Sequence, residues 1–97
     1  MIVRTTNLFD AWFKKLRDRQ AKIKIRGRID RATQGNLGDC RPINNNISEM
    51  RIDYGPGYRL YYTKQKEEII ILLVGGDKST QQSDIVRAGN ILKELMG

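Results

Sequence analysis

Apolar residues in the first third of the chain recur with the spacing of two amphipathic helices. Residues 2–5 predict a short strand, after which Thr6 or Asn7 can cap a helix. That helix presents apolar side chains at i, i+3, i+4 and i+7, namely Phe9, Trp12, Phe13 and Leu16. After a corner at residues 18–19, a second helix runs to Gln34 with its inward positions at Ala21, Ile25, Ile29 and Ala32. The short connection predicts an antiparallel helical hairpin.

From Ile47 the apolar spacing changes to a period of two, which is typical of strands. Upstream of it, residues 35–39 form a loop, and Pro42 allows at most an edge strand. We expect three strands separated by two turns, the strands at 47–54, 58–64 and 68–74 and the turns at 55–57 and 65–67. The third strand is apolar on both faces, as a central strand would be, and it ends at Gly75-Gly76-Asp77.

The last predicted element is a helix that begins near Ser79 and ends at about Met96. Ser79 and Gln82 have the spacing of a capping box. The inward residues of this helix are Ile85, Ala88, Leu92 and Leu95. The order β-α-α-β-β-β-α predicts one α+β domain over residues 1–97, in which the helical hairpin and the C-terminal helix pack on a mostly antiparallel sheet.

The charge of the chain points to an anionic partner. Lys and Arg number 18 against 11 Asp and Glu, and the formal net charge of +7 attracts polyanions. Nucleic acid is the first candidate and an acidic protein the second. The second helix carries a basic stripe that is either a solvated face or a docking surface for RNA or an acidic protein: Lys22, Lys24, Arg26, Arg28 and Arg31. We expect no secretion signal, no membrane contact and a cytoplasmic location.

The residue inventory argues against several kinds of chemistry. The chain has no histidine and a single cysteine, so Cys40 has neither a disulfide partner nor the usual base of a nucleophilic cysteine. The lack of histidine also argues against a zinc or iron site, and we expect no metal and no cofactor. Residues 75–80, GGDKST, look like part of a Walker A motif. Asp77 stands where that motif needs glycine, so we reject nucleotide binding.

Polar residues occupy positions of the predicted sheet that a buried core would disfavour. Glu49 and Arg51 are two apart on one strand, and Arg59 is on the next strand with Tyr61. A turn joins these strands, so the four side chains are expected on one exposed face. Lys78 lies at the start of the last helix, where free N–H groups attract an anion. Together they predict a phosphate site, with a solvated cross-strand ion network as the alternative.

A group of longer segments carries a family resemblance that covers nearly the whole chain. It comprises the helix with Phe9, Trp12 and Leu16, then IDR (29–31), GNLGD (35–39), SEMRI (48–52), GPGYRLYY (55–62) and LLVGGDKSTQ (72–81) with Asp84 and Ile85. These segments resemble the RelE/ParE superfamily and, within it, the HigB-like addiction module killer toxins. The GPGYR and GGDKSTQ segments, in this order and spacing, make the resemblance specific. It implies the same β-α-α-β-β-β-α fold.

The resemblance implies the toxin of a type II toxin–antitoxin system. Such toxins are metal-independent, ribosome-dependent endoribonucleases that cut mRNA in the ribosomal A site and inhibit translation. The implied partners are the ribosome with its mRNA, a cognate antitoxin from the same operon, commonly a helix-turn-helix protein, and operator DNA contacted through that antitoxin. Two alternatives stay open: a ParE-like toxin that inhibits gyrase, and a non-catalytic basic module that binds RNA or the antitoxin.

The implied reaction assigns roles to the four polar residues most concerned with catalysis. Attack of a ribose 2′-hydroxyl on the adjacent phosphate needs a base, an acid and stabilisation of negative charge. Glu49 is the candidate base, because it is the lone carboxylate of the cluster. Arg51 and Arg59 would stabilise the phosphorane, and Lys78 would contact the phosphate or protonate the leaving oxygen.

Three further residues are candidates for binding the substrate. Tyr61 could stack on an RNA base, because its strand parity makes it a weaker core candidate than Tyr58 or Tyr62. Arg41 and Gln81 are the other two substrate-binding candidates.

Overall fold

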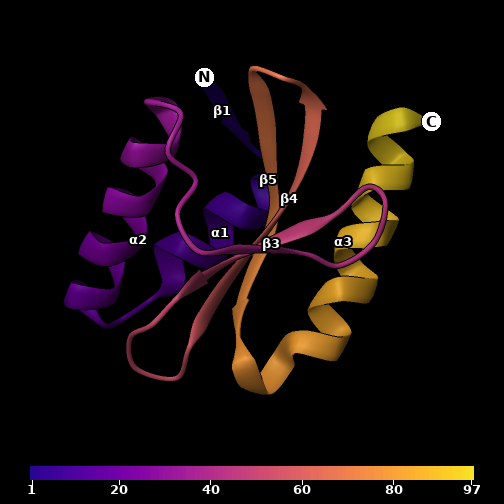
Figure 1. The fold of residues 1–97 in the computed structure, drawn as a ribbon. Coiled ribbons are helices and arrows are strands. Elements are labelled where there is room, and N and C mark those ends of the chain that lie inside the picture. The colour runs from indigo at the N-terminus through magenta and orange to yellow at the C-terminus, as the bar shows by residue number, and fades with distance from the viewer.

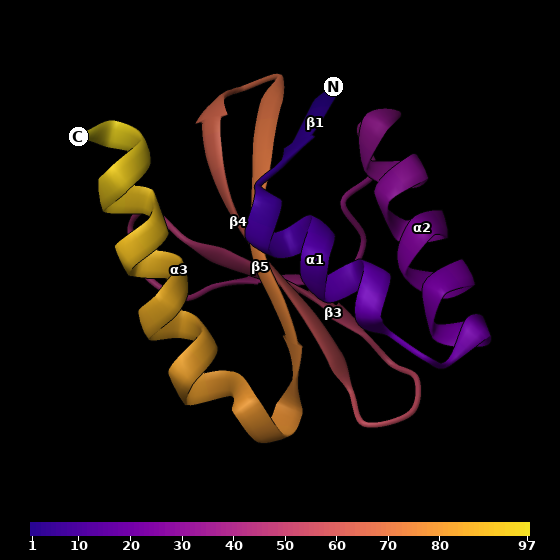
Figure 2. The ribbon, with the colours of Figure 1, turned by 180° about the vertical axis from the view of Figure 1, so that it is seen from behind.

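A sheet of five strands separates two helical layers in the computed structural model, which describes residues 1–97 (Figures 1 and 2). Helices α1 (Asn7–Lys15) and α2 (Arg19–Thr33) cover one face of the sheet, and α3 (Gln81–Met96) covers the other. The chain ends both lie at one end of the molecule, and the turn between β3 and β4 lies at the opposite end.

The strand order confirms the expected α+β fold with a mostly antiparallel sheet. From one edge to the other, the strands are β1 (Ile2–Thr5), β5 (Ile69–Asp77), β4 (Tyr58–Lys66), β3 (Ser48–Ile52) and β2 (Cys40–Pro42). Only β1 and β5 run parallel, and every other neighbouring pair is antiparallel. The edge strand β2 is a fifth strand that the predicted order lacks; it is three residues long and ends at Pro42, which cannot donate to a sheet ladder.

The core on the hairpin face follows the predicted periodicity. Thr6 caps α1 by accepting a hydrogen bond from the Phe9 N–H (3.1 Å), and the Asp18 carboxylate caps α2. Apolar side chains of both helices then meet the inward side chains of β3, β4 and β5, among them Phe9, Ile25, Met50, Leu60 and Leu72. The capping residues and the apolar spacing therefore predicted the position and the buried face of this hairpin.

A second core lies between the sheet and α3. It is built from buried side chains of both layers, including Tyr61, Leu73, Val74, Ala88 and Leu92. Two expectations fail here. Tyr61, thought to be the weaker core candidate, is fully buried, because helices cover both faces of the sheet. Leu95, expected to face inward, is 53% exposed, because the last turn of α3 extends past the core beside the exposed end of β4.

The end of β5 also differs from the expectation. The strand was expected over residues 68–74, and it continues through Gly75 and Gly76 to Asp77, all three of which pair with β4. A Cβ at Gly75 would overlap the Trp12 indole, so the glycine is needed where α1 packs on the sheet. Asp77 caps the short 3-10 helix η1 (Lys78–Thr80), and the expected Ser79 cap of α3 is absent. No helix combines the length and apolar character required to cross a membrane.

Candidate functional site

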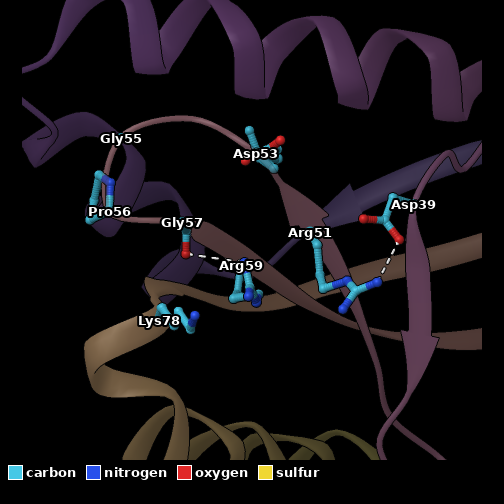
Figure 3. A pocket seen from close by; sticks show the side chains of 9 residues that line it. Asp39, Arg51, Asp53, Gly55, Pro56, Gly57, Arg59 and Lys78 are labelled. Carbon is cyan, nitrogen blue, oxygen red and sulfur yellow. Dashed lines mark hydrogen bonds and ion pairs between the residues drawn. The ribbon is translucent and has the colours of Figure 1, made fainter.

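A surface pocket of about 450 Å³ opens beside the turn between β3 and β4 (Figure 3). Three cationic side chains line it, and they come from three different elements: Arg51 from β3, Arg59 from β4 and Lys78 from η1. Two carboxylates, Asp39 and Asp53, lie on its other side, and residues 55–57 form the remaining wall. The pocket therefore unites three of the four residues expected to act on a phosphate.

Strand register explains why the two arginines share this pocket. Arg51 and Arg59 are direct partners in the β3–β4 ladder, so their side chains project from the same face of the sheet. Their side chains are 33% and 14% exposed. Two like charges opposite one another destabilise a sheet unless other groups compensate. Each arginine has an acidic neighbour that does so, and the two neighbours are different.

Asp39 compensates Arg51 from the loop before β2. Arg51 Nη2 donates to Asp39 Oδ1 at 2.9 Å (Figure 3). This hydrogen bond holds the pKa of the Asp39 carboxyl below its ordinary value and raises the pKa of Arg51. Asp39 is therefore ionised at neutral pH and faces the pocket. Sequence reasoning included Asp39 in the GNLGD segment and gave it no role.

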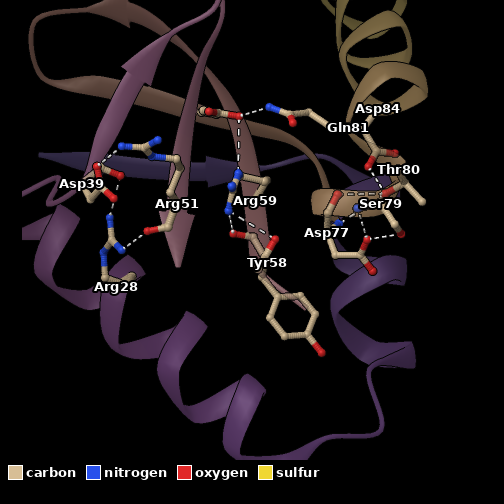
Figure 4. Close-up of polar contacts among 12 residues, drawn as sticks. Arg28, Asp39, Arg51, Tyr58, Arg59, Asp77, Ser79, Thr80, Gln81 and Asp84 are labelled. Atoms are coloured by element: carbon tan, nitrogen blue, oxygen red, sulfur yellow. Dashed lines mark hydrogen bonds and ion pairs between the residues drawn. The ribbon is translucent and has the colours of Figure 1, made fainter. Parts of the chain in front are cut away.

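Arg28 holds the loop that carries Asp39. Its guanidinium donates to three backbone carbonyls, those of Arg51 (2.5 Å), Leu37 (2.9 Å) and Asp39 (3.3 Å) (Figure 4). Gly38 has φ +71°, and a Cβ at this position would overlap the guanidinium. Arg28 was expected on the basic stripe of α2, which was either a solvated face or a docking surface for RNA or an acidic protein. It is instead half-buried, because the carbonyls of the loop satisfy its donors.

Glu49 compensates Arg59 from beneath the pocket. Its side chain is 1% exposed, and its Oε2 accepts a hydrogen bond from Gln81 Nε2 (3.0 Å) and lies 3.7 Å from Arg59 Nε (Figure 4). Glu49 does not line the pocket. The expectation that it lies on an exposed face is wrong, because the first residue of α3, Gln81, closes over it. The buried carboxylate neutralises Arg59 and lacks access to a substrate.

The turn between β3 and β4 lies beside both Arg59 and Lys78 at the mouth of the pocket. Arg59 Nη1 donates to the carbonyls of Gly57 and Tyr58, both at 3.3 Å. Gly57 has φ +81°, which favours glycine, and a Cβ there would lie 3.5 Å from both Arg59 Nη1 and Lys78 Cβ. Lys78 itself is exposed and forms no ion pair. A close turn therefore brings one guanidinium and one ammonium group to the same opening.

The three expected substrate-binding residues lie outside this pocket. Tyr61 is fully buried, so its ring has no free face on which a base could stack, and that expectation is wrong. Burial raises the pKa of its phenol, and its hydroxyl has no hydrogen-bond partner. Gln81 binds Glu49, and Arg41 lies exposed on β2 opposite Glu49.

Hydrogen bonds within the protein occupy the groups at residues 77–80 that were expected to bind an anion. The Asp77 carboxylate accepts hydrogen bonds from the Ser79 N–H (2.8 Å) and the Ser79 hydroxyl (2.5 Å). Thr80 Oγ1 donates to Asp84 Oδ2 at 2.5 Å (Figure 4). These contacts leave only the Lys78 side chain available from the segment. No group of three or more His, Cys, Asp or Glu side chains is arranged to hold a metal ion.

The fold and the pocket place the chain in the class of small three-layer α+β proteins, with a polar surface pocket lined by three cationic side chains and two carboxylates. More particularly, the chain belongs to the family described as phage derived protein Gp49-like (DUF891), which residues 11–93 match. It is 48% identical over 93 residues to an uncharacterized protein of Haemophilus influenzae strain Rd, covering 96% of this chain and 94% of that protein. No solved structure matches the chain.

Proposed function

We propose that this Gp49-like protein is a toxin of the type II toxin–antitoxin class, related to the HigB-like branch of the RelE/ParE superfamily. Its activity would be ribosome-dependent endoribonucleolytic cleavage of mRNA, with no metal ion. The observation that carries the proposal is the convergence of Arg51, Arg59 and Lys78 on one open pocket. Guanidinium and ammonium groups at such an opening suit a phosphodiester and the charge that develops on it during cleavage.

The proposed reaction is a transesterification within one RNA strand. The ribose 2′-oxygen forms a bond to the adjacent phosphorus, and the bond from phosphorus to the 5′-oxygen breaks. The products are a 2′,3′-cyclic phosphate and a 5′-hydroxyl end. Arg51 and Arg59 stabilise the phosphorane, and the Lys78 ammonium donates the proton that the departing 5′-oxygen needs.

Asp39 replaces Glu49 as the proposed proton acceptor. It is ionised, exposed and hydrogen-bonded to Arg51 in the pocket. A carboxylate whose pKa is lowered is a weak base. Most of the acceleration is therefore assigned to charge stabilisation and to the orientation of the mRNA by the ribosome. We therefore expect the protein to cleave free RNA only weakly.

The burial of Glu49 also favours a second candidate, a non-catalytic module that binds RNA through the same pocket. In that case the three cations hold phosphate groups and no bond is broken. The two candidates share the binding step and differ only in whether the RNA stays intact. Under either of them, the antitoxin and, through it, operator DNA are the further partners that the toxin class requires.

Primer extension on cellular mRNA after brief induction in a bacterial host tests the proposal. Wild-type protein should produce new 5′ ends within open reading frames, and Arg59→Ala should abolish them while remaining folded. Lys64→Ala, which removes a cation at the far end of β4, is the matched control and should cut like wild type.

Each alternative leaves its own signature in the same cells. Intact mRNA together with DNA damage and filamentation would support a gyrase inhibitor and overturn the nuclease. Intact mRNA with RNA bound to the purified protein would support the non-catalytic module. Cleavage by Arg59→Ala at the wild-type level would show that the pocket is not the site of the reaction.

A further inference from the structure

A second, shallower groove of about 230 Å³ adjoins the pocket on the side of α2. Lys24, Gly27, Arg28 and Arg31 of α2 line it together with residues 52–53 at the end of β3. Ile52 and Asp53 also line the pocket that holds Arg51 and Arg59. The two depressions therefore share two lining residues at the end of β3, and Figure 3 shows a helix running alongside the Asp53 end of the pocket.

Gly27 is the feature of this groove that the packing of the chain does not explain. It lies in the middle of α2, where glycine destabilises a helix relative to alanine. Apart from the helix's own backbone and the adjoining residues, no atom lies within 4 Å of the position that a Cβ would occupy, so no packed neighbour requires glycine. The missing side chain leaves the helix backbone open between Lys24 and Arg31. Glycine in such a place allows an external ligand to approach the backbone closely.

The cations of the groove have no acidic partners. The ion pairs of the structure involve Arg51, Arg59 and Arg87, so Lys24 and Arg31 have none. Lys24 Nζ lies 5.4 Å from the centre of the Tyr54 ring, and Arg31 Nε donates to the Gly27 carbonyl at 3.4 Å. Both side chains thus lie along the groove and keep their charge available for a ligand.

The charge of the pocket and groove together is strongly unbalanced. Six cationic side chains line them against two carboxylates: Lys24, Arg28, Arg31, Arg51, Arg59 and Lys78 against Asp39 and Asp53. Asp39 is already paired with Arg51, and the buried Glu49 balances Arg59, so four cations (Lys24, Arg28, Arg31 and Lys78) remain against Asp53. Two neighbouring depressions with this excess attract a ligand that carries several negative charges in a row.

We propose that the groove on α2 is a second RNA-binding subsite, in which Lys24 and Arg31 hold phosphates of the same strand that occupies the pocket. The proposal rests on the proposed function, because it extends the RNA from the pocket across Asp53 to Gly27. Lys24 and Arg31 lie about two helical turns apart, close to 10 Å along the axis. That span accommodates more than one phosphate of an extended single strand. The protein then recognises several consecutive nucleotides rather than one phosphodiester.

Binding of short and long RNA probes separates the subsite from the pocket. The probes are fluorescein-labelled 2′-O-methyl oligouridylates of 3 and 12 nucleotides, which cannot be cut because the nucleophile is blocked. The double variant Lys24→Gln/Arg31→Gln should bind the 12-mer about 10-fold more weakly at moderate salt. Its slope of log affinity against log salt should fall by about 1.4, because each lost phosphate contact contributes about 0.7 for a single strand. Its affinity for the 3-mer should stay within about 2-fold of wild type.

Two further variants make the result specific. Lys64→Gln/Lys66→Gln removes the same charge at the other end of β4 and should leave the preference for the 12-mer unchanged. Gly27→Leu fills the groove at a position with open space, so the protein should fold and lose affinity for the 12-mer only. Equal losses in the two double variants, or full 12-mer binding by Gly27→Leu, would overturn the subsite.

The same probes distinguish failure of the subsite from failure of the proposed function. Arg59→Ala should weaken the binding of both the 3-mer and the 12-mer. If Arg59→Ala binds both probes as tightly as wild type, the pocket is not the RNA-binding site and the proposed function is refuted. If only the α2 variants keep wild-type affinity for the 12-mer, the second subsite alone is refuted. Tighter binding of labelled poly-L-glutamate than of RNA of equal charge would assign the groove to an acidic protein instead.

Discussion

Replacing Glu49 by Gln tests whether this buried carboxylate positions Arg59 or acts on the substrate. The change keeps the shape and the contact with Gln81 and removes the negative charge 3.7 Å from Arg59 Nε. At an effective dielectric constant of about 20, the attraction at this separation is about 4 kcal/mol. Partial solvation of Arg59, which is 14% exposed, and the avoided desolvation of a carboxylate offset part of it.

We therefore expect Glu49→Gln to lower the free energy of unfolding by about 2 kcal/mol, less than the roughly 3–5 kcal/mol for a fully buried pair, because Arg59 keeps some contact with solvent. For a chain of 97 residues this corresponds to a fall in Tm of about 8–16 °C. Guanidinium chloride unfolding should show a lower midpoint with an unchanged slope. Glu94→Gln removes an exposed carboxylate from α3 and should leave the midpoint within the error of the measurement.

A double-mutant cycle with Arg59→Met isolates the pairwise interaction. If Glu49 acts mainly on Arg59, the double variant should be more stable than the sum of the single losses predicts, by about 1–2 kcal/mol. Wild-type stability of Glu49→Gln combined with complete loss of mRNA cleavage would refute this reasoning. Such a result would mean that the carboxylate meets the substrate directly.

Two other substitutions follow from the same contacts. Tyr61→Phe should raise the free energy of unfolding by about 1 kcal/mol, because it removes a buried hydroxyl that has no partner; a loss of stability in the same chemical denaturation would reveal a partner for it. Asp39→Asn should change the pH dependence of stability. The folded-state pKa of Asp39 lies below its ordinary 3.8, so its contribution is present above about pH 4 and is lost as the pH falls through the lower value. Urea midpoints should differ between wild type and variant from pH 7 to 5 and converge in stronger acid, with Asp53→Asn as control; a difference independent of pH would refute the role of the ionised pair.

Much of the candidate site was predictable because strand parity is a local property. Alternation places Arg51 and Arg59 on the same face, and the turn at residues 55–57 makes their strands neighbours. The apolar spacing of the helices likewise predicted the hairpin that covers the opposite face. These features depend on residues close in sequence, whose geometry the backbone period dictates.

Tertiary packing decided which of the polar side chains reach solvent. The alternation of residues along a strand does not predict how much of a sheet face a helix covers. Helix α3 covers only part of its face, so Glu49 and Tyr61 are buried while Arg51 remains partly exposed. Asp39 enters the pocket only because Arg28, on a distant helix, holds its loop through three carbonyls. The amino-acid sequence by itself therefore determined the three helices, four of the five strands, their order and the common face of the arginines, whereas the short edge strand β2 and η1 are absent from the predicted order. The burial of Glu49 and Tyr61 and the acidic partners of the two arginines came from contacts between residues far apart in the chain. The exposure of a side chain depends on what packs over it and not on its position in the repeat of the strand.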